Sequence, residues 1–325
     1  MNRIPLLNKQ FFIVLFVFLF SQMNAQKIEK YFDYKWRECK PNIARFHSYV
    51  IKTDSGYRRK DYYIRERKLQ MLGNYKDSLL QIKFGKFHYF HANGSPRTFG
   101  KYMNNKKEGL WLGYYDNKVK SDSAVYIHGN QIGKRLSWYP NGRLCDSVFT
   151  NINGSGIAIS RFDNGTLSST GQFSAEHKKD GIWNYYHLNG KISSIEIYHD
   201  SKLMVKQYYD ENGIQSTDTT SHDSYPLFPG GEKVWIKYLD KQIYFPPEYE
   251  IINGDVAVVI VKFTINENGM IENVFTSTSF DKNFDKIAEN AIKKSPKWIP
   301  GIEHNRRVKC TYTQPVTFKG LGEWY

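Results

Sequence analysis

The sequence predicts a mainly β-structured repeat array of stacked β-hairpins, followed by a small α+β domain. Three observations lead to this fold class. A glycine recurs at nearly constant intervals through the middle of the chain, an asparagine follows each glycine at a fixed offset, and beyond a polar linker the apolar residues take up alternating strand and helix spacings. The 16% content of aromatic residues favours strands, and 325 residues suffice for at least two structural units.

Residues 1–25 are expected to form a signal peptide. Arg3 and Lys9 give a positive start, an apolar run extends from Phe11 to Phe20, and a small polar stretch ends at Ala25. The run is about half of the ~20 residues that a membrane-spanning helix needs. We therefore expect export to the periplasm with cleavage after Ala25. An uncleaved anchor in the inner membrane, with the chain facing the periplasm, is the alternative.

Residues 26–84 are interpreted as a degenerate leading β region or cap. This stretch is rich in aromatic residues and is expected to turn at residues 73–75, but it lacks the regular glycine spacing of the segment that follows. The aromatic residues that suggest strands here are Tyr31, Phe32, Trp36, Tyr62 and Tyr63.

Residues 85–215 contain the repeats. The leading glycines stand at intervals of 24, 24, 23 and 25 residues, and an asparagine follows each of them eight residues later. The glycines are Gly85, Gly109, Gly133, Gly156 and Gly181, and the asparagines are Asn93, Asn117, Asn141, Asn164 and Asn189. An Asn-Gly pair between two β-rich runs predicts a hairpin with a type I′ turn, in which φ is positive at both central residues. Each unit is therefore predicted to be one hairpin.

The pattern of Gly-x-Trp-x-x-Tyr-Tyr with Asn-Gly resembles the MORN-like repeats of the YwqK antitoxin-type family, over residues 85–215. This resemblance implies a fold and no chemistry. The aromatic rows are expected to pack the stacked hairpins, with a sugar-binding platform as the alternative.

Residues 216–229 are rich in Ser, Thr and Asp and are interpreted as a linker. The domain at 230–320 then follows in the order α-β-β-α-β. A helix is predicted after Glu232, strands at 257–265 and 270–278, a second helix at 284–292 that ends before Pro296, and a last strand at 308–318.

This order, with Phe-Pro-Gly-Gly-Glu at 228–232 and Pro-Lys-Trp-Ile-Pro-Gly at 296–301, resembles the C-terminal domain of TonB-family energy transducers. The resemblance implies a domain without catalytic residues that binds outer-membrane transporters, because a peptide of the transporter adds as a strand at the domain's exposed edge. Carried onto this chain, the candidate segments are residues 244–246 and 307–318. The candidate partner-binding residues are Tyr244, Phe245, Pro246, Val308, Cys310, Tyr312, Gln314 and Val316. Trp298, Pro300 and Gly301 are expected to be structural.

The sequence departs from the transducer pattern at its amino end. A transducer keeps an N-terminal helix in the inner membrane and spans the periplasm with a proline-rich segment, whereas the leader of this chain is expected to be cleaved and the chain has only 11 prolines. A partner-docking protein is therefore favoured over a membrane-anchored energy transducer, which is the alternative. Pairing of edge strands into a homodimer is a further possibility.

The formal net charge of +14 lies mainly in the repeat half, since residues 26–229 carry +11. A basic surface attracts anionic glycans or lipids, which makes a binding module for an envelope polymer or lipid the second functional hypothesis. Because the chain is expected to be exported, nucleic acid is not expected to be its partner. Cys39, Cys145 and Cys310 show no metal-ligand spacing, and their disulfide state stays open. No cofactor is expected, and the absence of a catalytic motif argues against an enzyme.

Overall fold

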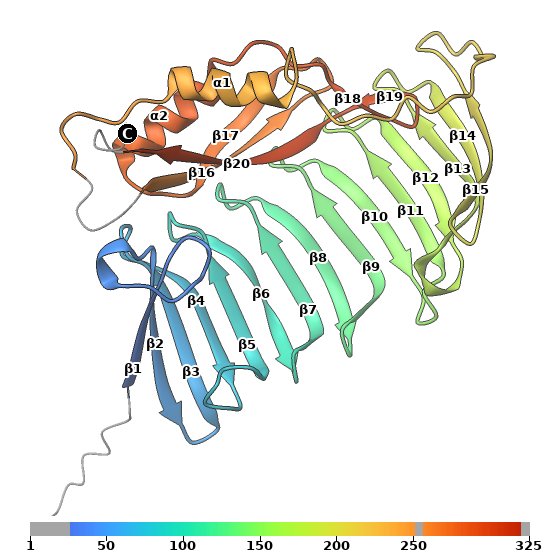
Figure 1. Ribbon diagram of the computed structural model, residues 1–325. Coiled ribbons are helices and arrows are strands. Elements are labelled where there is room, and N and C mark those ends of the chain that lie inside the picture. Colours follow the sequence, from blue (N-terminus) through green and yellow to red (C-terminus); the bar gives the residue numbers. More distant parts are fainter. Residues whose placement is uncertain (1–26, 251–255, 320–325) are drawn as a thin grey trace, which may run out of the picture.

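The computed structural model describes residues 27–250 and 256–319. Within them, a 15-stranded antiparallel sheet contains β1 to β15 in sequence order, so each strand pairs with its neighbours in the chain (Figure 1). The predicted leader and cleavage site lie outside the described residues. The strands are β1 Lys27–Phe32, β2 Phe46–Thr53, β3 Gly56–Tyr63, β4 Lys68–Tyr75, β5 Lys83–Phe90, β6 Pro96–Met103, β7 Lys106–Tyr114, β8 Lys120–Ile127, β9 Asn130–Trp138, β10 Leu144–Thr150, β11 Gly156–Arg161, β12 Leu167–Phe173, β13 Lys179–Tyr186, β14 Ile192–His199 and β15 Lys202–Tyr208.

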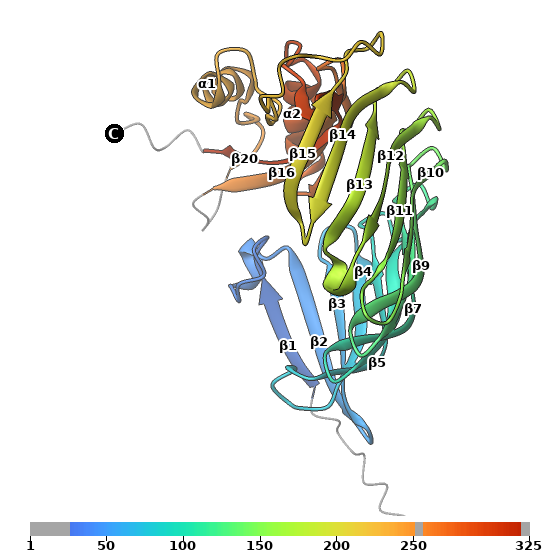
Figure 2. The same ribbon diagram turned by 90° about the vertical axis from the view of Figure 1, so that its right-hand side faces the viewer.

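The predicted array of stacked hairpins is thus confirmed, and the leading region supplies the first strands of the same sheet from Lys27 onward. The turn predicted at residues 73–75 is wrong, because these residues form the end of β4. Short 3₁₀ turns at Pro41–Ile43 and Ala175–His177 interrupt two of the connections. The sheet is curved, and the C-terminal domain lies across its open side (Figures 1 and 2).

The two faces of the sheet can be told apart from the strand register, because cross-strand partners share a face. One unbroken row of partners crosses the sheet and includes Ser48, Asp61, Met71 and Tyr89 near its start and Tyr185 near its end. Tyr185 stacks on a residue of the C-terminal domain. We therefore call the face that carries this row the inner face, and the opposite face the outer face.

Aromatic rings on the inner face pack over glycines of the neighbouring strand. A Cβ atom built on Gly100 would lie 2.2 Å from the ring of Trp111, and one on Gly171 would lie 2.1 Å from the ring of Trp183. Both indoles donate to backbone carbonyls of the same neighbouring strand, at 3.1 and 3.0 Å. These two indoles are 3% and 5% exposed, so they act as packing groups of the sheet.

The prediction of type I′ turns at the Asn-Gly pairs is wrong. In the first such turn φ is positive at Gly94 and not at Asn93, and the Gly94 amide donates to the carbonyl of His91. The Asn93 side chain accepts from the Ser95 amide and donates to the Asp116 carbonyl of the next hairpin, 3.0 Å away. The asparagine is therefore used for its side-chain amide, which links consecutive hairpins, and only the glycine is needed for its backbone.

The C-terminal domain has the predicted order with one addition. Its elements are α1 Glu232–Gln242, β16 Ala257–Ile265, β17 Ile271–Thr278, α2 Lys282–Lys293, β18 Gly301–Glu303, β19 Arg306–Val308 and β20 Cys310–Phe318. The three-stranded sheet has the order β17-β16-β20, and its buried side chains form one core with those of the two helices. The hairpin β18–β19 was not predicted. It turns at His304 and Asn305, where φ is +54° and +58°, so Val308 belongs to this hairpin and not to the last strand.

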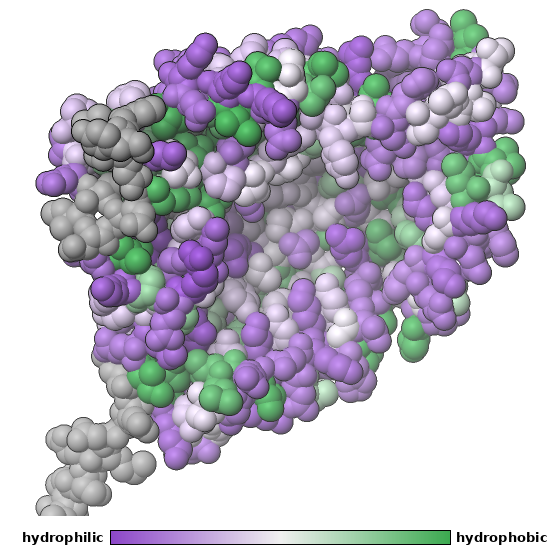
Figure 3. Space-filling view, in the orientation of Figure 1, coloured by the Kyte–Doolittle hydropathy of each residue, from purple (hydrophilic) through white to green (hydrophobic). Residues whose placement is uncertain are grey.

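The C-terminal domain contacts the repeat sheet near both ends. Arg65, in the turn between β3 and β4, contacts the Phe280 carbonyl and the Asp281 carboxylate at the start of α2. At the other end, hairpin β18–β19 lies against β12 to β15. Between the two contacts, the surface is hollowed beneath the domain (Figure 3).

Candidate partner-docking site

Strand β20 forms an open edge of the C-terminal sheet. Among the described residues it pairs only with β16, in a register without irregularity from Ala257↔Phe318 to Ile265↔Cys310. The backbone groups on its other side face away from the sheet. Such a row of unpaired donors and acceptors can pair with an added strand.

The predicted side chains on β20 are committed to the domain's own core. The Tyr312 hydroxyl donates to the Pro226 carbonyl at 2.8 Å, and the Trp235 indole donates to the Gln314 side-chain oxygen at 2.9 Å. Val316 is 3% exposed. Since side chains alternate along a strand, these residues point toward the helices. Cys310 is half-buried, and burial raises the pKa of its thiol.

The side chains of β20 that face away from the helices were missed by the sequence reasoning. They are the exposed Thr311, Thr313, Pro315 and Thr317. The alternation of residue types along the strand could have predicted them, because the large and apolar residues at every second position become buried and leave the threonines and Pro315 exposed. A partner that lies along β20 meets the threonines, and its fit is decided by them and by the backbone.

Pro315 interrupts the open edge. A proline has no N–H to donate, and its place in an uninterrupted pairing means that its nitrogen faces away from β16. Its carbonyl accepts from the Gln314 side-chain amide at 2.7 Å. An added strand therefore finds free donors at Thr311 and Thr313, on one side of the proline, and at Thr317 on the other.

The second predicted segment lies elsewhere in the domain. Phe245 packs edge-on against Phe284 with ring centroids 5.3 Å apart, and Pro246 is fully buried, whereas Tyr244 is 62% exposed. Tyr244 and Pro246 line a cavity of about 470 Å³ between the end of α1 and α2. No residue of β20 lines that cavity, so the two predicted segments do not form one site.

Trp298 belongs to the domain core. It is 5% exposed, its indole donates to Ser295 at 3.1 Å, and its backbone amide donates to the Gly269 carbonyl at 2.8 Å. A Cβ atom on Gly269 would lie 2.0 Å from the Trp298 carbonyl, so this turn requires glycine, whose φ there is +77°. These contacts hold the backbone at Trp298 in place just before hairpin β18–β19 begins at Gly301.

Hairpin β18–β19 was also missed, and it joins the two parts of the molecule. The His304 ring stacks on Tyr185 at 3.5 Å, and its Nδ1 lies 2.8 Å from a carboxylate oxygen of Glu196. The Arg306 guanidinium reaches the carbonyls of Ser168 and Tyr186. The turn dipeptide His304-Asn305 between short β-prone runs was the available sequence signal.

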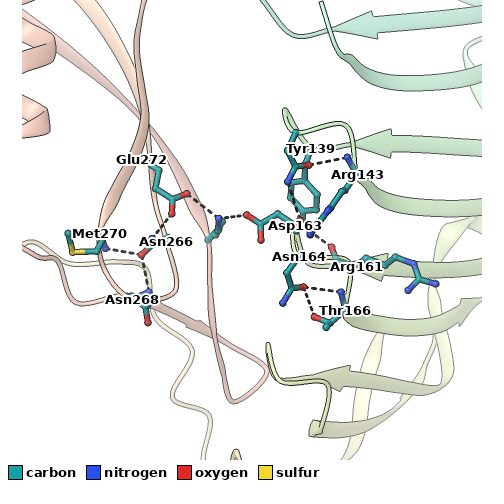
Figure 4. Close-up of polar contacts among 12 residues, drawn as sticks. Tyr139, Arg143, Arg161, Asp163, Asn164, Thr166, Asn266, Asn268, Met270 and Glu272 are labelled. Atoms are coloured by element: carbon teal, nitrogen blue, oxygen red, sulfur yellow. Dashed lines mark hydrogen bonds and ion pairs between the residues drawn. The ribbon is translucent and has the colours of Figure 1, made fainter. Parts of the chain in front are cut away.

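An ion pair adds to this junction after the hairpin. The Lys309 ammonium lies 3.1 Å from Glu272 on β17 and also contacts Asp163, beside β11 of the repeat sheet. Figure 4 shows Glu272 and Asp163 on the two sides of this junction. The two acidic partners hold the pKa of Lys309 above its usual range although burial opposes this. The start of β20 is thus attached to the array.

Two kinds of feature were not found among the described residues, a metal-ligand cluster and a membrane-spanning helix. No group of three His, Cys, Asp or Glu side chains within 27–250 and 256–319 is placed to hold a metal ion. The three cysteines are free, and burial raises the pKa of each thiol. Among these residues, none of the helices has the length and apolarity that crossing a membrane requires.

Comparison with known proteins identifies the C-terminal part. Residues 241–319 match the family described as Gram-negative bacterial TonB protein C-terminal. No curated protein matches the chain. The match covers β16 to β20 and both candidate segments. It includes no part of the repeat sheet and therefore suggests no kind of partner for that sheet.

Proposed function

We propose that this chain is an exported envelope protein whose TonB-type domain docks an envelope partner along the open edge of β20, while the hairpin sheet acts as a scaffold. The observation that carries the proposal is the unpaired edge of β20 in a domain that matches the TonB C-terminal family. This family is a non-enzymatic transducer domain, and it makes an outer-membrane receptor the favoured partner class. Its presence implies a periplasmic location.

The structure favours a short added strand. Thr311 and Thr313 lie before Pro315 and present outward backbone groups, whereas the proline offers no donor. We therefore place the partner's backbone beside residues 311–313, which makes Thr313 the position to probe.

A photocrosslinking amino acid at Thr313 tests this proposal in intact cells. We expect an adduct with an outer-membrane or periplasmic protein. The matched control carries the same group at Asn273, an exposed residue of β17 at the opposite edge of the same sheet. Adducts at Asn273 without adducts at Thr313, or no adduct at Thr313 although the protein accumulates normally, would argue against docking at β20.

The remaining expectations are proposals of the same kind. We propose that the repeats are MORN-like and that the leader is cleaved after Ala25, which an intact mass beginning at Gln26 would support. A mass that retains the leader would favour the anchored energy transducer instead. Pairing of β20 edges into a homodimer is tested by sedimentation of the purified chain.

A further inference from the structure

A recess of about 280 Å³ lies where the first strands of the array meet the C-terminal domain. Residues 44–46 and 63–66 of the array line one side of it, and residues 277–280, at the end of β17 and before α2, line the other. The contact of Arg65 with Asp281 lies beside it. Among the described residues, none of those on β20 lines this recess, so docking along β20 does not depend on it.

Arg45 supplies a guanidinium group to this recess, and its backbone is held on both sides. Its amide donates to the Phe32 carbonyl at 2.8 Å, and its carbonyl accepts from the Ile64 amide at 3.1 Å. The central carbon of the guanidinium lies 4.1 Å from the centroid of the Phe280 ring, which belongs to the C-terminal domain. The side chain therefore reaches from the array to the domain side of the recess.

The donors of this guanidinium have no acceptor within residues 27–250 and 256–319. The Nε atom of Arg45 is buried without a hydrogen-bond partner, and the other two nitrogens form no hydrogen bond or ion pair there. Burial lowers the pKa of Arg45 to about 10, although Asp285 opposes this. The Asp285 carboxylate accepts from the Ser279 hydroxyl and the Phe280 amide instead. A partly buried cation without acceptors is unfavourable, so a ligand that supplies them is expected to bind.

Glu66 contributes the opposite charge to the same recess. Its carboxylate forms no ion pair with Arg45, and it has no hydrogen bond to any other described residue. The rest of the lining is mainly apolar and comes from Ala44, Phe46, Ile64, Ala92 and Phe280. A simple anion would be repelled by Glu66, and a simple cation would be repelled by Arg45. A ligand that carries one group of each charge suits both side chains.

We propose that this recess binds a small α-amino acid in its zwitterionic form. The carboxylate of the ligand accepts hydrogen bonds from the Arg45 guanidinium, which offers paired donors in one plane. The ammonium group of the ligand donates to the Glu66 carboxylate, and its short side chain lies against the apolar lining. The volume of about 280 Å³ is at the lower end for ligand sites, so it suits a single amino acid better than a segment of a polymer.

Calorimetric titration of the purified full chain tests the proposal. The probe is L-alanine, and the comparison ligands are propionate, which lacks the ammonium group, and ethylamine, which lacks the carboxylate. We expect alanine to bind and each comparison ligand to bind about tenfold more weakly, as for loss of one charged contact. Arg45→Met and Glu66→Gln should each weaken alanine binding by about tenfold. The control Arg67→Gln removes an exposed charge in the same turn as Glu66, outside the recess, and leaves the affinity unchanged.

Thermal unfolding of the unliganded variants separates binding from a structural role of Arg45. Because the donors of Arg45 are unpaired, Arg45→Met should not lower the melting temperature. A guanidinium that only fastened the domain to the array would lower the melting temperature when removed and would leave alanine binding unchanged.

Three results of the titration overturn the proposal: no binding of alanine, equal affinity for alanine and either comparison ligand, or equal loss of alanine binding in Arg67→Gln and Arg45→Met. A lowered melting temperature of Arg45→Met with unchanged alanine binding also overturns it. If Arg45→Met fails to fold by circular dichroism, Glu66→Gln decides alone, because Glu66 lies in the turn after β3. Crosslinking at Thr313 is independent of all these outcomes.

Discussion

At the scale of single residues, the repeat sheet depends on glycines that lie beneath aromatic rings. The Trp183 indole covers Gly171, and its nitrogen donates to the Gln172 carbonyl at 3.0 Å. A side chain at Gly171 would occupy the space that the ring fills. The Gly100 and Trp111 pair has the same geometry, so this arrangement recurs in an earlier repeat.

Replacing Gly171 with alanine is expected to lower the free energy of unfolding by about 1–3 kcal/mol, because the new methyl group forces the Trp183 ring from its site. Urea unfolding followed by tryptophan fluorescence measures this change. Ser147→Ala, at a half-buried outer-face position on β10, is the control and should change stability little. Equal stability of the Gly171 variant and the native chain would show that the ring moves freely.

Pro315 is expected to keep the β20 edge from pairing along its whole length. Pro315→Thr restores a backbone donor on the outward side and so should increase self-association. Sedimentation equilibrium measures the change, with Thr317→Ser as a control that leaves the backbone unaltered. A Pro315→Thr protein that stays as monomeric as the native chain would mean that another feature protects the edge.

At the scale of elements, hairpin β18–β19 fastens the C-terminal domain to the sheet. Arg306 is 8% exposed and contacts two carbonyls of β12 and β13, and its guanidinium also lies 5.4 Å from the Phe162 ring and 5.3 Å from the Tyr185 ring. The short hairpin thus places the Arg306 guanidinium among carbonyl groups and aromatic rings that come from several repeats.

Arg306→Ala should weaken this junction by about 2 kcal/mol, since it removes hydrogen bonds from a charged and buried donor. Limited proteolysis is the measurement: cleavage within residues 216–224 should become faster as the domain separates. The neighbouring Arg307 is exposed, so Arg307→Ala should leave the cleavage rate unchanged. Equal rates for both variants would contradict the role of the hairpin.

The same junction is expected to weaken in acid. Burial acts to raise the pKa of Glu196, but hydrogen bonds from His304 and Tyr198 outweigh it and hold that pKa below its usual value of 4.5. A carboxyl group with a lowered pKa contributes stability above pH 4.5 and loses it as the pH falls through the lowered value. Proteolytic release of the domain should therefore rise at low pH. Glu196→Gln should reduce this pH dependence, and an unchanged profile would exclude Glu196 as its source.

At the scale of the whole molecule, the C-terminal domain bridges the curved sheet. Arg65 and Asp281 join one end, and hairpin β18–β19 joins the other, with the hollow between them (Figures 1 and 3). The distance between the contacts is set by the number of intervening repeats. Because each hairpin pairs only with its neighbours, the length of such an array can change while its local pairing persists.

Deleting one repeat, residues 109–132, is therefore expected to leave a folded sheet but to break the contact of Arg65 with Asp281, because the buried hairpin β18–β19 holds the other end by several bonds. Cysteines placed at Arg65 and Asp281 measure this, because a short bifunctional thiol crosslinker should join them in the full-length array and not in the shortened one. Circular dichroism controls for folding. Equal crosslinking in both proteins would mean that the sheet adjusts its curvature to the domain.

Much of the fold could be predicted because the relevant signals are local. The glycine and asparagine spacing fixes where each hairpin turns, and alternating apolar residues mark β16 and β17 within one residue of their observed starts. The edge position of β20 followed from the resemblance at 228–301. These features depend on neighbouring residues and on backbone preferences, so a single sequence contains them.

Only the tertiary structure decided how these elements are used. The asparagine side chains of the turns donate to carbonyls more than twenty residues away. The side chains of Tyr312 and Gln314 form hydrogen bonds with Pro226 and Trp235 and are therefore not available to a partner at the edge. The docking of hairpin β18–β19 likewise arises from contacts between strands that are far apart in the sequence. The sequence by itself determined the hairpins and the domain type through local geometry, whereas long-range packing decided which faces remain open to partners.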